Sequence, residues 1–293
     1  MVTLYLMTKK GFDTLNYLIA SNLDKYIAEV VVGEDLDVLN DYSKDIKLLC
    51  KNHKISFKKR TDFFESEAKY AIAISWKWLI NNIDQKLIVL HDSLLPKYRG
   101  FAPLVNALIN NENKVGVTAL WATQDYDKGA VILQRSLNVN YPKKIENLIN
   151  EVSSLYKEIV AEIICKLVNS EKLSGKKQEE DLSTYSLWRD EEDYLIDWTL
   201  DADVILRFVN AVSYPYKGAS TFINNNKYRI TKVDLIEDVE IENRAPGKVI
   251  FIKEEKPVVV CGKGLLKINN LLDVNDNNIL PLKSFRVRFK GVK

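Results

Sequence analysis

The hydrophobic pattern of this chain changes along its length, and that change constrains the fold more than any other feature. In the first half, short apolar runs rich in β-branched residues alternate with stretches that carry apolar residues at helical spacing. Such alternation is typical of βαβ units that build a mostly parallel sheet. We therefore predict an α/β, Rossmann-like domain. The expected strands are residues 2–7, 27–32, 70–76, 87–90, 116–123 and 130–140, and the expected helices are residues 14–22, 36–52, 103–109 and 145–168.

The second part of the chain follows a different period. After a short helix expected over residues 201–212, apolar and polar residues alternate, as is typical of strands, and turn-forming residues at 224–226 and 262–264 indicate hairpins. We expect a small antiparallel β-barrel of the OB type. A polar run at 170–181 suits a solvated linker. Because 293 residues exceed what one core usually supports, we predict two domains, 1–180 and 181–293. The expected strands of the barrel are residues 219–224, 228–235, 247–252, 258–261, 265–268 and 285–289.

Composition argues against several classes of protein. Lys plus Arg less Asp plus Glu gives 42 − 40 = +2, which provides no general basic field for nucleic acid. Two histidines and three widely spaced cysteines argue against a metal site and indicate reduced thiols. No apolar window reaches the length of a membrane-spanning helix, and the apolar run at 2–7 is too short for a signal peptide. We expect a soluble cytoplasmic protein that binds no metal.

One segment concentrates the residues suited to catalysis. It reads His91-Asp92-Ser93-Leu94-Leu95-Pro96-Lys97-Tyr98-Arg99-Gly100 and directly follows the expected strand 87–90. His91 thus stands at the carboxyl end of a strand, where open α/β sheets place their ligand crevices. Asp127 follows 36 residues later, in a turn between two expected strands from which a carboxylate can reach an imidazole. The segment is therefore the candidate active site.

These residues and their spacing resemble the 10-formyltetrahydrofolate-dependent formyltransferase family. The shared pattern is His-x-Ser-Leu-Leu-Pro-x-Tyr-Arg-Gly at 91–100, Gly-Val-Thr at 116–118 and Asp-x-Gly at 127–129. The resemblance implies transfer of a formyl group from 10-formyltetrahydrofolate to an acceptor amine. Later motifs resemble the carboxy-terminal barrel of methionyl-tRNA formyltransferases and nucleotide-sugar N-formyltransferases. They are Ile-Asp-Trp at 196–198, Asn-Ala-Val at 210–212, Pro215, Gly-Ala at 218–219 and Pro-Gly at 246–247.

The implied reaction requires a group that takes the proton of the amine and a donor that stabilises the charge developing on the formyl oxygen. We assign the proton transfer to His91, with Asp127 orienting the ring and favouring its charged form. The alternatives without catalysis are a histidine satisfied at a strand end and an aspartate that forms a turn.

One position departs from the family pattern. The family has an asparagine two residues before the histidine, which helps to hold the formyl oxygen, whereas this chain has Val89, which offers no hydrogen-bond donor. We expect Asn106, one turn after Pro103 on the next helix, to substitute for it. The alternatives are that Asn106 is a helix-surface residue, that the charged His91 or a backbone amide near residues 76–79 is the donor, or that the chain is slow or no longer catalyses the reaction.

Further candidate residues flank this motif. The resemblance implies a pterin-side wall at residues 72–79 and a second set of contacts around residues 118–129, although aromatic residues in such places are more often core. Arg99 can contact a phosphate or the aspartate network, or be a surface charge, and Ser93 can simply shape its loop. The predicted contacts to the formyl donor are Ser75, Trp76, Trp78, Leu79, Thr118 and Gly129, and those to the acceptor are Ser93, Arg99 and Tyr126.

The acceptor is predicted from charge. Residues 32–45, where the resemblance implies a basic loop for a methionyl-tRNA formyltransferase, contain five acidic residues and one lysine. Residues 186–293 contain 17 Lys plus Arg and 16 Asp plus Glu, so neither part has the positive surplus that binds tRNA. Tyr-Ser-Leu-Trp-Arg at 185–189 is also similar to the sugar-modifying branch.

We therefore expect the acceptor to be the amine of a dTDP- or UDP-linked 4-amino sugar used in surface polysaccharide biosynthesis, with no nucleic-acid or membrane partner. A homodimer is one option for the assembly. The alternatives are a methionyl-tRNA formyltransferase and a non-catalytic protein that binds folate or a sugar nucleotide.

Overall fold

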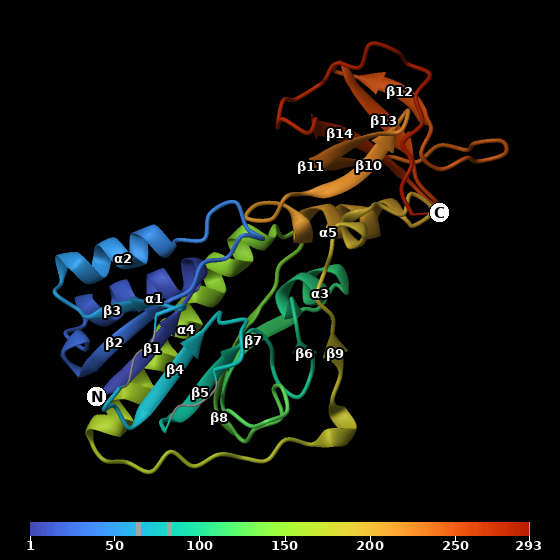
Figure 1. Cartoon of the computed structure of the whole chain (residues 1–293). Coiled ribbons are helices and arrows are strands. Elements are labelled where there is room, and N and C mark those ends of the chain that lie inside the picture. The colour runs from blue at the N-terminus through green and yellow to red at the C-terminus, as the bar shows by residue number, and fades with distance from the viewer. Residues whose placement is uncertain (63–65, 81–83, 293) are drawn as a thin grey trace. The chain divides into compact units, whose positions relative to one another are not determined.

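The computed structural model describes residues 1–62, 66–80 and 84–292. By its contacts the chain divides into two compact units (Figure 1). The first consists of Met1–Leu104, Asn113–Val139 and Asn147–Leu187, and the second of Val105–Glu112, Asn140–Glu146 and Trp188–Lys293.

The first unit is built on a seven-stranded sheet with the strand order β3-β2-β1-β4-β5-β7-β8. The first five of these strands run parallel, whereas β7 pairs antiparallel with both β5 and β8. This is the predicted Rossmann-like α/β fold. The strands are β1 (Val2–Leu6), β2 (Ile27–Val32), β3 (Phe57–Lys59), β4 (Tyr70–Ile74), β5 (Lys86–His91), β7 (Lys114–Trp121) and β8 (Val131–Asn138).

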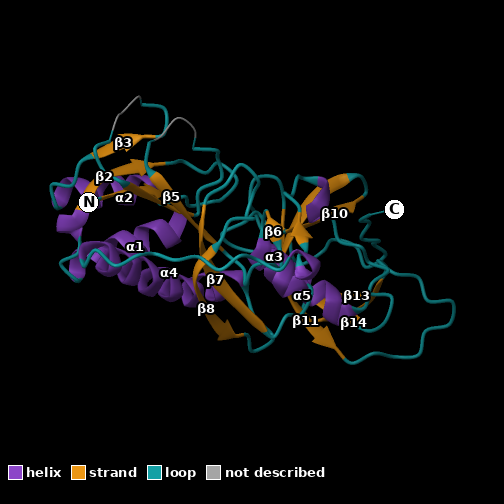
Figure 2. Cartoon of the chain, turned by 90° about the horizontal axis from the view of Figure 1, so that it is seen from below, coloured by secondary structure: helices purple, strands orange, loops and turns teal. Residues whose placement is uncertain are grey.

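In the described residues, three α-helices belong to this sheet domain, and a fourth begins in it. Helices α1 (Thr8–Ala20) and α4 (Ile145–Val168) lie side by side along one face of the sheet (Figure 2), and α1 also contacts α2 (Ser43–Asn52). Every residue of β1 is buried, as expected for a parallel strand covered on both faces. The short helix α3 (Pro103–Ile109) begins in the first unit and ends in the second.

Several predicted bounds are confirmed and others are wrong. β2, α3 and α4 have the predicted bounds, whereas the short edge strand β3 was not predicted. Residues 36–42 are not helical, because the two carboxylate oxygens of Asp41 accept hydrogen bonds from the backbone N–H of Ser43 (3.0 Å) and of Asp35 (3.1 Å). Such side-chain bonds offer the backbone an alternative to helical hydrogen bonds.

Most residues of the polar run at 170–181 are exposed, as we predicted for a solvated linker, but the run is also attached to the first unit. Lys176 forms an antiparallel bridge with Val131 at the edge of β8, Gln178 is buried, and Glu180 forms an ion pair with the buried Arg99. The segment therefore completes the first unit, which continues to Leu187. Its polarity reflects partners far away in the sequence, which composition does not reveal.

The second unit contains a five-stranded antiparallel sheet in the order β10-β11-β14-β13-β12. The predicted hairpin turn is confirmed: Asn224 and Asn225 both have positive φ, as the favoured two-residue turns require. The strands are β10 (Ala219–Ile223), β11 (Asn226–Ile236), β12 (Val249–Lys253), β13 (Lys256–Val260) and β14 (Leu265–Leu272).

The end of the chain closes this sheet. Residues 285–289, which we predicted to be a strand, form only isolated bridges with their surroundings. Arg288 bridges Lys248, which directly precedes β12, and Lys290 bridges Phe222 of β10. Because β10 and β12 are the two edge strands, these bridges close the sheet into the expected OB-like barrel.

The interior of the barrel is aromatic and aliphatic. The rings of Trp198 and Phe289, both buried, lie 5.5 Å apart, and the indole N–H of Trp198 donates to Thr221 Oγ1 at 3.2 Å. Helix α5 (Ala202–Val212) packs on β11. Across the described ranges, no helix is both long enough and apolar enough to cross a membrane.

Candidate active site

His91 is the last residue of β5, and its backbone lies opposite Thr118 of β7. The side chain is buried, with 8% of its surface exposed. Its Nε2 atom lies 2.8 Å from the backbone oxygen of Tyr98. Because a carbonyl oxygen only accepts hydrogen bonds, Nε2 carries a hydrogen, and the neutral ring presents its lone pair at Nδ1.

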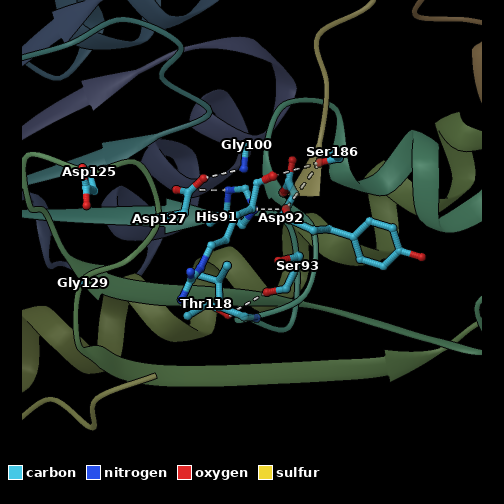
Figure 3. A network of polar contacts seen from close by, with 12 residues as sticks. His91, Asp92, Ser93, Gly100, Thr118, Asp125, Asp127, Gly129 and Ser186 are labelled. Atoms are coloured by element: carbon cyan, nitrogen blue, oxygen red, sulfur yellow. Dashed lines mark hydrogen bonds and ion pairs between the residues drawn. The ribbon is translucent and has the colours of Figure 1, made fainter. Parts of the chain in front are cut away.

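Asp127 faces this lone pair. One carboxylate oxygen lies 3.5 Å from His91 Nδ1, and the other accepts a 2.8 Å hydrogen bond from the backbone N–H of Gly100 (Figure 3). The segment 91–100 therefore both supplies the imidazole and holds the carboxylate. The two residues that the sequence singled out are brought together, and their catalytic role stays a prediction. His91 Nδ1 and the facing Asp127 oxygen both accept hydrogen bonds, so the pair suits a proton donor such as an amine. When the ring is protonated, Nδ1–H can itself donate to the carboxylate.

Thr118 and Ser93 fold the loop that follows His91. The Thr118 hydroxyl donates to the Ser93 carbonyl (2.6 Å) and accepts from Leu95 N (3.2 Å) and Gln134 Nε2 (2.9 Å). The Ser93 hydroxyl donates to the Lys97 carbonyl (2.6 Å). Both hydroxyls thus hold the backbone of the site, and their predicted contacts to ligands stay predictions.

The predicted wall for the formyl donor follows β4. Ser75 has a φ of 54°, and the Trp76 ring contacts the Tyr5 ring (5.1 Å) and the Trp78 ring (5.2 Å) edge to face. Leu79 is exposed. Trp76 Nε1 is one of the buried side-chain atoms of the described residues that have no hydrogen-bond partner, and Ser75 lies beside the Tyr156 hydroxyl. Buried polar atoms are normally paired, so Trp76 Nε1 suits a polar ligand at this edge of the sheet.

Two residues bear on the family asparagine that this chain lacks: Val89, which stands in its place, and Asn106, the predicted substitute. Val89 packs against an apolar cluster that includes Tyr5, Ala73 and Trp76, so it contributes no donor. Asn106 belongs to the second unit, where its Oδ1 accepts a 2.6 Å hydrogen bond from Arg189 Nη2. Its role as the substitute donor stays a prediction.

Arg99 is not on the surface. It is fully buried and binds Gln178, Glu180 and the hydroxyl of Tyr185, and hydrogen bonding to Glu180 raises the pKa of its guanidinium. Of the alternatives stated for Arg99, the aspartate network fits these contacts, because Gln178 in turn binds the backbone of the Asp127 turn.

Tyr126 and Gly129, the last two predicted residues, lie in the same turn as Asp127. Tyr126 is exposed, and its ring lies 6.5 Å from that of Phe101. Gly129 has a steric reason to be glycine, since a Cβ there would lie 1.6 Å from the Trp121 carbonyl oxygen. The predicted contacts of Tyr126 to the acceptor and of Gly129 to the formyl donor stay predictions.

A second polar group lies beside the site and was not predicted. Asp92, the residue after His91, forms an ion pair with Lys10 of α1 and accepts a 2.6 Å hydrogen bond from the Tyr156 hydroxyl of α4. Burial, together with the neighbouring Asp92, raises the pKa of Tyr156 well above its usual value. An acidic residue next to the motif histidine was the only sequence signal for this group. In the part of the chain that the structure describes, no three His, Cys, Asp or Glu side chains gather as metal ligands.

Comparison with known proteins identifies the family. Residues 67–164 match the formyl transferase family model, and residues 189–288 match the model for the formyl transferase C-terminal domain. Together with the His91 and Asp127 geometry and the two-unit fold, these matches show that the chain belongs to the formyl transferase family.

The similar proteins include methionyl-tRNA formyltransferases and sugar N-formyltransferases. A methionyl-tRNA formyltransferase of Citrifermentans bemidjiense is 32% identical over 69% of this chain and 62% of its own length. This chain thus spans less than two thirds of the length of that curated relative. Among solved structures, WlaRD, a sugar 3N-formyl transferase crystallised with dTDP and 5-N-formyl-THF, is 18% identical and superposes with a TM-score of 0.69 over 94% of this chain and 98% of its own. An N-formyltransferase of Helicobacter canadensis with folinic acid and dTDP-3-aminofucose is also 18% identical, with a TM-score of 0.68 over 91% and 97%. At such identity these two structures show the shared fold.

Proposed function

We propose that this chain transfers the formyl group of 10-formyltetrahydrofolate to the primary amine of a nucleotide-linked amino sugar. The observation that carries the proposal is the pair of acceptor atoms, His91 Nδ1 and Asp127 Oδ1, that face each other 3.5 Å apart at the carboxyl end of β5. An amine placed beside this pair can donate its hydrogens to both atoms, which orients its nitrogen lone pair for attack.

The reaction forms a bond between the amine nitrogen and the formyl carbon, and it breaks the bond between that carbon and the tenth nitrogen of the folate. The proton lost by the amine passes to Nδ1 of His91, where the Asp127 carboxylate stabilises the imidazolium. The same proton then passes to the leaving folate nitrogen. Because the Tyr98 carbonyl holds Nε2–H, the ring keeps Nδ1 directed at the reacting nitrogen throughout.

The formyl donor is assigned to the edge that follows β4. Trp76 Nε1, a buried atom without a hydrogen-bond partner, would bind a polar group of the pterin together with Ser75, and the tryptophan rings would flank its flat face. The donor that stabilises the formyl oxygen would be the charged His91, a backbone amide of residues 76–79, or Asn106.

Charge supports a small acceptor. In the acidic stretch after β2, Glu34 pairs with Lys47, and Asp35 and Asp37 both pair with Lys77. Lys47 and Lys77 are therefore engaged with carboxylates of this stretch, which itself contains five acidic residues and one lysine and so has no positive surplus for an RNA backbone. The high mutual coverage with a sugar 3N-formyl transferase is consistent with this assignment.

A methionyl-tRNA formyltransferase is the second candidate, and it is favoured by the name of the 32% identical relative. That match leaves about a third of the relative's length unaligned, and it does not distinguish the acceptors of the two groups.

Acceptor competition tests the proposal. The full chain is supplied with 10-formyltetrahydrofolate and, separately, with dTDP- and UDP-linked 3-amino and 4-amino sugars and with methionyl-tRNA. We expect the highest kcat/KM on one of the sugar nucleotides, with little change between about 50 and about 200 mM salt, since few phosphates are neutralised. A higher kcat/KM on methionyl-tRNA, falling steeply with salt, would favour the second candidate. No turnover with any acceptor would indicate a binding protein.

A further inference from the structure

The segment 175–186 surrounds the Asp127 turn and is attached to the first unit at both ends. At its start, Lys176 and Val131 exchange two backbone hydrogen bonds of 2.8 Å. At its end, β9 (Tyr185–Ser186) pairs in parallel with β6 (Arg99–Gly100), as Figure 1 shows. The segment lies between the two family matches, so neither match covers it.

Gln178 is the residue of this segment that contacts the turn. It is 7% exposed, and its amide nitrogen donates to the carbonyl oxygens of Asp127 (2.6 Å) and Gly129 (2.8 Å). Its amide oxygen accepts from Arg99 Nε (3.2 Å) and Nη2 (2.8 Å). Since a guanidinium only donates hydrogen bonds, the orientation of the amide is fixed, with its N–H groups directed at the turn.

The Arg99 guanidinium is itself oriented by an ion pair with Glu180. Its two terminal nitrogens bind the two oxygens of Glu180 at 2.8 and 2.9 Å, a bidentate geometry that gives strong and directional hydrogen bonds. Arg99 bonding lowers the pKa of Glu180, so the pair is ionised at neutral pH. A chain of contacts therefore runs from Glu180 through Arg99 and Gln178 to the backbone of Asp127.

The turn needs such support. Asp127 has a φ of 55°, in the left-handed region that is uncommon for residues other than glycine and persists only where the surroundings hold it. A rotation of this residue would move the carboxylate away from both His91 Nδ1 and the Gly100 amide.

We propose that Gln178, oriented by Arg99 and Glu180, is a positioning residue that sets the distance between the Asp127 carboxylate and His91. The expected effect on kcat rests on the proposed formyl transfer, whereas the expected effect on the position of Asp127 relative to His91 does not. Gln178 touches no reacting atom, and it acts only through the backbone of Asp127.

Two variants of nearly equal shape test the inference. Gln178→Glu and Gln178→Met keep the length of the side chain but remove the two N–H donors, and Glu179→Gln changes the exposed neighbour as a control. We expect kcat to fall on the order of tenfold to a hundredfold in both Gln178 variants, as misplaced catalytic groups do. The KM for the formyl donor should stay within about threefold, because the binding of the folate is not altered. Glu179→Gln should match the wild type.

Nuclear magnetic resonance of His91 provides a second readout that needs no turnover. The chain has only two histidines, so the ring Hε1 signal of His91 is assigned by its loss in His91→Asn. Gln178→Met should move this signal in the same direction as Asp127→Asn, whereas Glu179→Gln should not move it. An unmoved signal in folded Gln178→Met would overturn the inference. A moved signal in a chain without formyl transfer would reject the proposed function alone.

Discussion

At the scale of residues, the candidate site depends on two backbone contacts that fix the side chains of His91 and Asp127. Tyr98 O holds one ring nitrogen of His91, and the Gly100 amide holds one oxygen of Asp127, so each side chain keeps one atom for chemistry. Both backbone groups belong to the segment 91–100. The segment that supplies His91 therefore also holds Asp127, which lies 36 residues later in the chain.

Replacement of the imidazole tests this arrangement. His91→Asn should lower kcat by about 10²–10⁴-fold, the usual contribution of a positioned acid or base. Binding of a folate analogue, measured by tryptophan fluorescence, should change little, because Trp76 and Trp78 belong to another loop. Retention of more than about a tenth of wild-type kcat, well outside that range, would remove His91 from the chemistry.

At the scale of elements, a buried polar group ties two helices to the strand that ends at His91. Lys10 of α1 and Tyr156 of α4 both bind Asp92, and the Lys10 ammonium also lies 5.6 Å from the centre of the Tyr156 ring. Since Asp92 directly follows His91, the packing of the helices and the position of the imidazole are linked through one peptide bond.

Loss of one charge should reveal how much this link stabilises the first unit. Lys10→Met leaves Asp92 without its cation in a buried setting and should lower the free energy of unfolding by about 3–5 kcal/mol. Tyr156→Phe removes one hydrogen bond to the same carboxylate and should cost about 1–3 kcal/mol. The adjacent Lys9, whose side chain is more exposed than that of Lys10 and pairs with Asp13 one turn along the same helix, is the matched control, and Lys9→Met should cost less than about 1 kcal/mol.

Urea unfolding followed by circular dichroism measures these differences. The expected order of destabilisation is Lys10→Met, then Tyr156→Phe, then Lys9→Met. Equal midpoints for the Lys9 and Lys10 variants would show that the pair of Lys10 with Asp92 contributes no more than the pair of Lys9 with Asp13 within α1.

At the scale of the whole molecule, each unit has its own core and its own buried cysteine. Cys50 lies in the first unit and Cys261 in the second, and burial raises the pKa of each thiol to about 12. Both thiols should therefore react slowly at pH 8 unless the unit around them opens. The barrel of the second unit is closed by the chain end, where Phe289 is 1% exposed.

Removal of the Phe289 ring should open the second unit selectively. Phe289→Ala is expected to lower its stability by about 3–5 kcal/mol. Pulsed thiol labelling should then modify Cys261 faster while Cys50 keeps its wild-type rate. Phe285→Ala, at the exposed side of the same segment, is the control and should leave both rates unchanged. If Cys50 and Cys261 became reactive together, the two units would not open independently.

The sequence by itself determined most of the order of strands and helices, apart from short elements such as β3, and it located the candidate catalytic motif. Parallel strands buried on both faces must be apolar and β-branched, so β2 could be located within its true bounds, and α4 shows helical periodicity throughout. The pairing of His91 with Asp127 followed from the motif and its spacing, because both positions lie next to strands that pair directly.

Tertiary structure alone decided which polar residues are structural. Residues 170–181 have the composition of a linker, yet Gln178 binds both Arg99 and the Asp127 carbonyl, and Glu180 binds Arg99. No local sequence pattern reveals partners so far away in the chain. Arg99 could equally be a surface charge until its bidentate partner was located. A polar side chain is read from sequence as exposed by default, and only the folded chain shows where a hydrogen-bonded partner offsets the free-energy cost of burying it.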